Sequence, residues 1–245
     1  MAAGTDVSPL VPCDWLKEKI AAGDLGNIVL LDVSWSSQKD CYEDYKQRHI
    51  PGAVFFNVMV GPHTDLFPRN LPTPEVFQDL TRAAGVNDDS HVILYSDSDN
   101  CGFFMSGRAW WTFTMFGAKK VSILNGGLQR WLTLGYPTTS EVPTVKRGNF
   151  TARYDSQHRL TFEEMTQRIA SGATIADSRP AKSYAEVMEG AGVDTSKPFI
   201  SYCNSGMSSS TLSFAYALCG GSDFAVYHGG FTEWKNKAQD RIEKS

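Results

Sequence analysis

The chain has 245 residues, of which 42% are hydrophobic and 20% are charged, and its formal net charge is −4. This composition is typical of a globular protein with one large domain or two small ones. The acidic balance argues against a nucleic-acid partner, and no apolar run approaches the roughly 20 residues that cross a bilayer. The first residues lack the pattern of a secretory or transit signal, so we expect a cytoplasmic protein, with a mitochondrial location as the alternative.

The five cysteines are odd in number and include no C-x-x-C pair. This pattern favours neither a disulfide framework nor a zinc site, so we expect reduced thiols and no bound metal. One cysteine, discussed below, stands out by its position between a strand and a helix.

Helices and strands alternate along the first half of the chain. The sequence pattern predicts helices at 11–22, 75–84 and 107–116, and strands at 27–33, 53–58, 91–95 and 121–124, and the polar segment 40–48 is compatible with a further helix. Four prolines predict an irregular loop at 60–74. The alternation indicates an α/β fold in which helices cover a parallel sheet on both faces.

The second half of the chain repeats the first in shortened form. LNGGLQRW at 124–131 returns as YHGGFTEW at 227–234, which indicates two copies of one unit. We therefore predict a first domain at 1–137, a linker at 138–149 and a second domain at 150–245.

The shortening falls between two of the repeated strands. Asp32 and Tyr95 are 63 positions apart, whereas Asp177 and Tyr202 are 25 apart, a deficit of 38 positions. The missing part corresponds to the 53–58 strand, the proline-rich loop and a helix. We expect the loss of an internal strand, which would leave apolar surface and backbone groups in need of cover.

Cys203 follows a short apolar strand at 199–202 and precedes a polar loop and a helix that starts near residue 208. Loop amides and a helix N-terminus present positive partial charge to a sulfur placed in this way, which favours the thiolate and lowers the thiol pKa. This arrangement favours a reactive cysteine. The alternative is a small buried hydrophobic residue at a strand end.

Several motifs, in this order and spacing, resemble those of the thiosulfate and 3-mercaptopyruvate sulfurtransferases, which have two tandem rhodanese-like domains. They are RHIPGA at 48–53, GRAWW at 107–111, NGGLQRW at 125–131, DSR at 177–179 and the cysteine loop of the second copy. The resemblance implies a catalytically silent first domain, with Ser96 at the position of Cys203. It also implies a Cys203 persulfide, a small-molecule sulfur donor, and a thiol acceptor such as thioredoxin, or cyanide, with no cofactor.

The loop after the nucleophile bears on the sulfur donor. The resemblance implies that Asn204, Gly206, Met207 and Ser208 bind the substrate, and because this loop is neutral it favours 3-mercaptopyruvate over thiosulfate. Ser205 matches a loop serine that hydrogen-bonds the reacting sulfur or relays a proton, although ordinary loop polarity would also explain it.

Four further residues are candidates through the resemblance. His49 matches a histidine of the family's proton-relay group, and Asp40 is a weaker candidate for its acidic partner. A histidine that anchors the turn before Pro51 and a solvated carboxylate at a helix start are the alternatives. Arg179 and Lys182 are candidates for binding the substrate carboxylate, although the family's arginine positions are not matched here.

Two other functional classes were weighed. The shortened second unit leaves open a truncated, weakly active or inactive sulfurtransferase-like protein that acts as a binding or regulatory module. A cysteine phosphatase would need an arginine that closes a C-x₅-R phosphate cradle. Ser209 stands at that position, which argues strongly against a phosphatase.

Overall fold

A computed structural model describes residues 7–97, 103–178 and 194–241 of the chain. Contacts divide the chain into two compact units, which we call the first unit, Met1–Val58 with Pro72–Tyr154, and the second unit, Met59–Leu71 with Asp155–Ser245. The domain boundaries expected from the sequence stay a prediction. The contacts add that part of the proline-rich loop of the first half belongs with the second unit.

The first unit contains a five-stranded sheet in which every neighbouring pair of strands is parallel. Its order is β1 (Leu10–Val11), β5 (Lys120–Leu124), β4 (His91–Tyr95), β2 (Ile28–Asp32) and β3 (Val54–Phe55). The helices that connect the strands are α1 (Cys13–Ala21), α2 (Cys41–Gln47), α3 (Pro74–Ala83), α4 (Phe103–Met115) and α5 (Gly127–Thr133). Each residue of the central strand β4 is buried, as expected for a strand covered on both faces.

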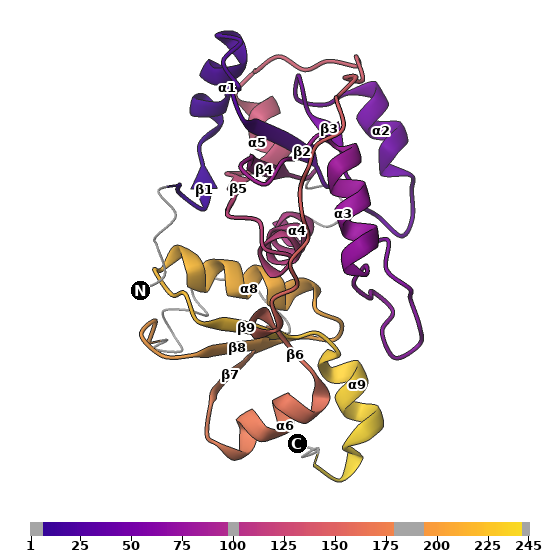
Figure 1. The fold of residues 1–245 in the computed structure, drawn as a ribbon, viewed down its shortest axis with the longest axis vertical. Coiled ribbons are helices and arrows are strands. Elements are labelled where there is room, and N and C mark those ends of the chain that lie inside the picture. Colours follow the sequence, from indigo (N-terminus) through magenta and orange to yellow (C-terminus); the bar gives the residue numbers. More distant parts are fainter. Residues whose placement is uncertain (1–6, 98–102, 179–193, 242–245) are drawn as a thin grey trace. The chain divides into compact units, whose positions relative to one another are not determined.

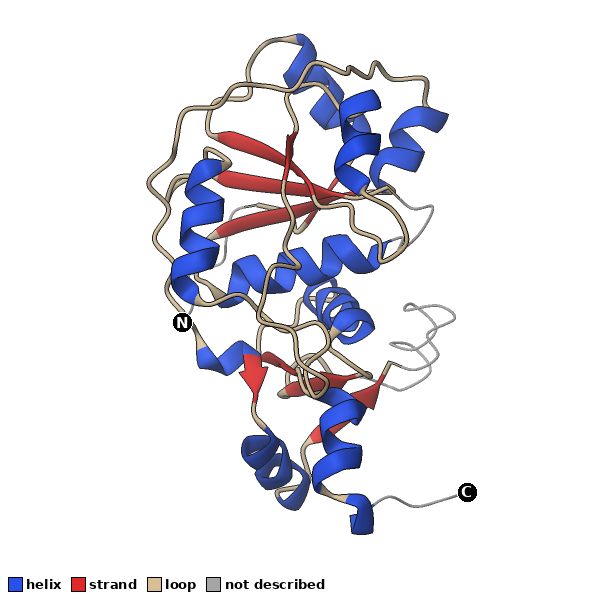
Figure 2. Cartoon of the chain, turned by 90° about the vertical axis from the view of Figure 1, so that its right-hand side faces the viewer, coloured by secondary structure: helices blue, strands red, loops and turns tan. Residues whose placement is uncertain are grey.

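Helices cover this first sheet on both faces (Figures 1 and 2). On one face, Leu16 of α1 and Trp131 of α5 pack in a cluster with the strands. On the other face the packing is aromatic: Phe77 of α3 packs edge-on against Phe113 of α4 and stacks on Phe116, which follows α4. Trp110 and Trp111 of α4 are buried, which confirms the interpretation of this aromatic segment as core.

The second unit contains a four-stranded parallel sheet. Its order is β6 (Arg159–Leu160), β9 (Phe224–Tyr227), β8 (Phe199–Tyr202) and β7 (Thr174–Asp177). Helix α8 (Met207–Leu218) covers one face, and α6 (Phe162–Ala170) and α9 (Gly230–Lys237) cover the other (Figure 1). Two 3₁₀ turns, Ser156–His158 and Gln239–Arg241, complete the unit.

The strand order of the second sheet repeats the order β1-β5-β4-β2 of the first. The α/β prediction is thereby confirmed. The described part of the second unit contains no counterpart of β3. Because β3 is the edge strand of the first sheet, the expectation that an internal strand is missing was wrong. The four described strands of the second unit form an unbroken parallel ladder without such an edge strand.

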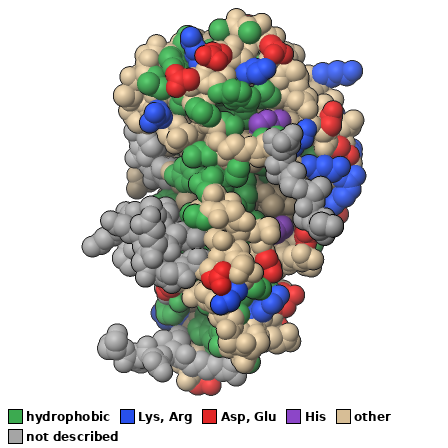
Figure 3. Space-filling view, turned by 90° about the vertical axis from the view of Figure 1, so that its left-hand side faces the viewer, with side chains coloured by type: hydrophobic (Ala, Val, Ile, Leu, Met, Phe, Trp, Pro, Cys, Tyr) green, Lys and Arg blue, Asp and Glu red, His purple; other side chains and the backbone are tan. Residues whose placement is uncertain are grey.

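Among the described helices, none is long and apolar enough to cross a membrane. On the face shown in Figure 3, acidic and basic side chains are interspersed.

Candidate active site

Cys203 lies directly after β8, and the turn between β9 and α9 holds its backbone. The Cys203 carbonyl accepts a hydrogen bond from the Phe231 amide at 2.7 Å, and the Asn204 carbonyl accepts one from the Thr232 amide at 3.3 Å. Gly230 makes this close approach feasible, because a Cβ atom there would lie 2.2 Å from the Cys203 carbonyl oxygen, and its φ of +55° favours glycine. The second glycine of the Gly-Gly pair is therefore a requirement of the cysteine loop.

The first unit builds the same backbone contact around a serine. The Leu128 amide donates to the Ser96 carbonyl at 3.2 Å, and a Cβ atom at Gly127 would lie 2.5 Å from that oxygen. Ser96 therefore occupies the backbone position in the first unit that Cys203 occupies in the second. This agrees with the alignment of the two copies and leaves the first unit without a thiol at this point.

The sulfur of Cys203 is buried and accepts hydrogen bonds from its own loop. The side chain is 3% exposed. Its Sγ accepts from the Gly206 amide at 3.1 Å and from the Ser209 hydroxyl at 3.5 Å. Gly206 adopts a φ of 82°, which turns its amide toward the sulfur at the start of α8.

These contacts act on the pKa of Cys203 in opposite directions. Burial is the largest single influence and raises the thiol pKa. Hydrogen bonds from the hydroxyl and amide of Ser209, from the Ser208 hydroxyl and from the Ser205 amide stabilise the thiolate, and together they outweigh the burial. The net pKa lies below the ordinary value of 9.0. A thiolate is the nucleophilic form of cysteine, so the loop prepares Cys203 for attack on an electrophilic sulfur.

Serine side chains fix the shape of the loop from both sides. The Ser178 hydroxyl, directly after β7, donates to the Tyr202 carbonyl at 3.1 Å and lies 2.9 Å from the Ser208 hydroxyl. Within α8, the Ser210 hydroxyl donates to the Gly206 carbonyl at 2.5 Å. Hydrogen bonds from neighbouring serine side chains therefore hold Gly206 and Ser208 of the predicted loop.

Ser205 receives a hydrogen bond from a residue that the sequence analysis did not single out. The Arg69 guanidinium donates from Nη1 to the Ser205 hydroxyl at 3.0 Å, and Ser205 is 5% exposed. Arg69 lies in the segment Met59–Leu71, which contacts place in the second unit. A lone arginine in a proline-rich loop gives no local signal of such a role, because the two residues are 136 positions apart.

His49 and Asp40 lie in the first unit, in local structural settings. The ring of His49 is fully buried, with Nδ1 2.7 Å from the Tyr45 carbonyl and Nε2 3.1 Å from the Glu141 carbonyl. Asp40 caps α2 by accepting a hydrogen bond from the Tyr42 amide at 2.9 Å. Their part in proton relay stays a prediction. Arg179 and Lys182 lie outside the described residues.

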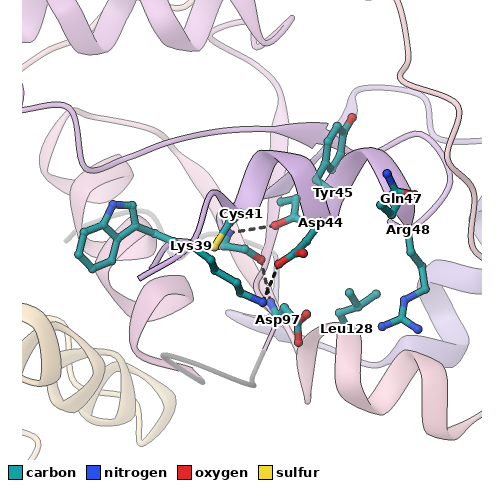
Figure 4. A pocket seen from close by; sticks show the side chains of 11 residues that line it. Lys39, Cys41, Asp44, Tyr45, Gln47, Arg48, Asp97 and Leu128 are labelled. Atoms are coloured by element: carbon teal, nitrogen blue, oxygen red, sulfur yellow. Dashed lines mark hydrogen bonds and ion pairs between the residues drawn. The ribbon is translucent and has the colours of Figure 1, made fainter. Parts of the chain in front are cut away.

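A polar pocket of about 310 Å³ lies in the first unit, at the carboxyl ends of β2 and β4 (Figure 4). Lys39 reaches across it to Asp44, with Nζ 2.6 Å from the carboxylate. Burial raises the pKa of Asp32 on its wall. Cys41 is the cysteine of this pocket, and it stands at the start of a helix rather than in a strand-loop-helix turn. The pocket therefore does not reproduce the chemistry of the Cys203 loop.

The described side chains offer no evident metal site. In the part of the chain that the structure covers, no group of three or more histidine, cysteine, aspartate or glutamate side chains is arranged to hold an ion.

Comparisons with known proteins agree with this fold. The family of the rhodanese-like domain matches residues 13–134 and 167–237. Thiosulfate sulfurtransferase from Gallus gallus is 33% identical over 272 aligned residues, which cover 94% of each chain. 3-Mercaptopyruvate sulfurtransferase from Mus musculus is 30% identical and covers 98% of this chain and 96% of its own. The crystal structure of SseA from Escherichia coli, a 3-mercaptopyruvate sulfotransferase by its description, has a TM-score of 0.80 at 28% identity, covering 91% of this chain and 99% of its own. The chain belongs to the rhodanese-like family of sulfurtransferases.

Proposed function

We propose that this sulfurtransferase takes sulfur from 3-mercaptopyruvate, with thiosulfate as a less favoured donor, and carries it as a persulfide on Cys203. The acceptor is a thiol, such as that of thioredoxin, or cyanide. One observation carries the proposal. The Cys203 sulfur accepts hydrogen bonds from the Gly206 amide and the Ser209 hydroxyl, in a loop that lowers its pKa.

The first half-reaction moves one sulfur atom from the donor to Cys203. The thiolate attacks the sulfur of 3-mercaptopyruvate, an S–S bond forms, and the C–S bond of the donor breaks. The bonding electron pair leaves with the carbon as the enolate of pyruvate, which takes up one proton to become pyruvate. Cys203 is thereby oxidised to the persulfide, and the donor carbon is reduced.

The second half-reaction restores the enzyme. An acceptor thiolate attacks the outer sulfur of the persulfide, the S–S bond to Cys203 breaks, and the electron pair returns to Cys203 as its thiolate. The same hydrogen bonds that favour the resting thiolate make it a good leaving group at this step. Splitting the transfer in two replaces one difficult reaction with two easier ones.

The composition of the loop supports the choice of donor. Residues 203–208 carry no lysine or arginine, so the loop lacks the adjacent cations that a dianion such as thiosulfate requires. A monoanionic keto acid makes a smaller demand for compensating charge. Asn204, Gly206, Met207 and Ser208 are the proposed contacts of the donor, and Ser205 is the proposed path for the proton.

Pyruvate release from 3-mercaptopyruvate in the presence of a thiol tests the proposal. We expect wild-type protein to turn over, Cys203→Ser to release no pyruvate above background, and Cys219→Ser to behave as wild type, because Cys219 is exposed at the far end of α8. Equal release from wild type and Cys203→Ser would overturn the proposal. Absence of turnover by a stably folded wild type would favour the alternative, a binding or regulatory module.

A further inference from the structure

We propose that Arg69 binds the anionic group of the sulfur donor at the Cys203 loop. The inference deepens the proposed function, on which it rests, by naming the charge that holds the donor. It starts from one contact, in which the Arg69 guanidinium donates to the hydroxyl of Ser205 at 3.0 Å, two residues after the nucleophile.

The position of Arg69 is set by the segment that carries it. Within Met59–Leu71, the Asn70 amide donates to Nδ1 of His63 at 3.1 Å, and the Asn70 side chain donates to the Pro62 carbonyl at 3.1 Å. Gly61 lies so close to this part of the chain that a Cβ atom would be 2.2 Å from the Asn70 carbonyl oxygen. The segment is therefore a closed loop with a defined shape, and Arg69 stands at its returning end.

An aromatic contact fixes the same loop to the body of the second unit. The ring of Phe67 stacks on His228, with centroids 5.8 Å apart and planes inclined by 21°. His228 precedes the Gly229-Gly230 pair, and the two residues that follow this pair, Phe231 and Thr232, donate their amides to the Cys203 and Asn204 carbonyls. The segment that carries Arg69 therefore contacts the second unit at two points, through Phe67 at His228 and through Arg69 at Ser205.

The reaction calls for a cation at this place. The attacking thiolate and the donor are both anions, so their approach is repulsive unless a positive charge compensates it. Residues 203–208 supply none. A guanidinium carries five N–H donors in a rigid fork, and so it can donate to a hydroxyl and to the carboxylate of a monoanionic donor together. Arg69 therefore supplies from the first half of the chain the charge that the cysteine loop lacks.

Steady-state kinetics with 3-mercaptopyruvate test this role. We expect Arg69→Gln to raise KM about 10- to 100-fold, the range of a lost hydrogen bond to a charged group, with a smaller fall in kcat. Arg69→Lys should recover part of the loss, since it keeps the charge without the fork. Arg147→Gln is the matched control, because Arg147 is half exposed and pairs with Asp79 at the surface of the first unit.

A second measurement does not depend on turnover. Cys203 is alkylated with anionic iodoacetate and with neutral iodoacetamide, and peptide mass analysis gives the rate at that residue. If Arg69 attracts anions to the sulfur, the iodoacetate-to-iodoacetamide rate ratio falls in Arg69→Gln, on the order of fivefold, and falls less in Arg69→Lys. A purely structural role would slow or speed both reagents alike. Thermal unfolding of each variant checks that it folds. If Arg69→Gln does not fold, Arg69→Lys is compared with wild type instead.

The two measurements separate the possible failures. An unchanged rate ratio together with an unchanged KM in Arg69→Gln overturns the role of Arg69 and leaves the proposed function standing. If wild type releases no pyruvate, but the iodoacetate-to-iodoacetamide rate ratio is still lower in Arg69→Gln than in wild type, the proposed function is overturned. An anion-binding site at Arg69 then remains.

Discussion

Replacing Ser209 by alanine should raise the pKa of Cys203. Ser209 is fully buried in the first turn of α8, and its hydroxyl donates to the Cys203 sulfur at 3.5 Å. The substitution removes this donor, keeps the backbone amide and adds no bulk. Only the free energy of the thiolate relative to the thiol should therefore change by a large amount.

The magnitude follows from the geometry of the contact. A hydrogen bond to a charged group contributes about 1.5–3 kcal/mol, and one pKa unit corresponds to about 1.4 kcal/mol. The donor-to-sulfur distance is at the long end of the range, so we take the lower figure and expect a rise of about one unit. The amide of Gly206, 3.1 Å from the sulfur, remains and limits the rise.

The pH dependence of Cys203 alkylation by iodoacetamide measures this shift, because only the thiolate reacts. Ser213→Ala is the matched control. It removes a buried hydroxyl one turn further along α8, where Ser213 lies 2.9 Å from the Ser201 hydroxyl and, among the described residues, makes no hydrogen bond to the Cys203 sulfur. The reasoning is refuted if the midpoint of Ser209→Ala stays at the wild-type value, or if Ser213→Ala moves it equally.

Three further predictions concern backbone strain, pH and proton relay. Gly230→Ala should lower thermal stability and slow Cys203 alkylation, because the new Cβ meets the Cys203 carbonyl oxygen. Gly220→Ala is the control, because its Cβ would meet nothing within 4 Å and it suffers only the strain of a positive φ, about 1–3 kcal/mol. Equal losses of stability in both variants would count against a close contact between Gly230 and the Cys203 carbonyl. Because the pKa of Cys203 is lowered in the folded state, its contribution to the free energy of unfolding should be fully present above the pKa of the unfolded thiol and be lost as pH falls through the folded pKa. Denaturant titration of wild type and Cys203→Ser at several pH values measures this contribution. A stability difference between the two proteins that does not change with pH would contradict it. His49→Asn should lower kcat for 3-mercaptopyruvate if His49 relays a proton, whereas reduced thermal stability with unchanged kcat would restrict it to the buried contacts described.

Cys203 could be proposed as the nucleophile from the sequence because every signal for it is local. The chain places a strand, Cys203, the loop glycine Gly206 and a helix one after another. The structure has this strand at Phe199–Tyr202 and the helix at Met207–Leu218. The repeat of the Gly-Gly turn is equally local. It gives Ser96 and Cys203 the same backbone contact in the two units.

The rest of the site depends on distant or directional information. Arg69 reaches Ser205 across 136 positions, and nothing in the spacing of the chain shows that the proline-rich loop belongs with the second unit. Ser209 reads as an ordinary residue of the first helical turn, and only the direction of its side chain shows the contact with sulfur. The order of strands, and hence the edge position of β3, is likewise set by tertiary packing rather than by local pattern.

The mass of the intact protein after exposure to 3-mercaptopyruvate, without an acceptor, tests the central claim most directly. We predict that wild type gains one sulfur atom, that peptide analysis finds it on Cys203, and that a thiol or cyanide removes it. Cys203→Ser should gain none. No gain by wild type, or the same gain by Cys203→Ser, would contradict a persulfide carried on Cys203.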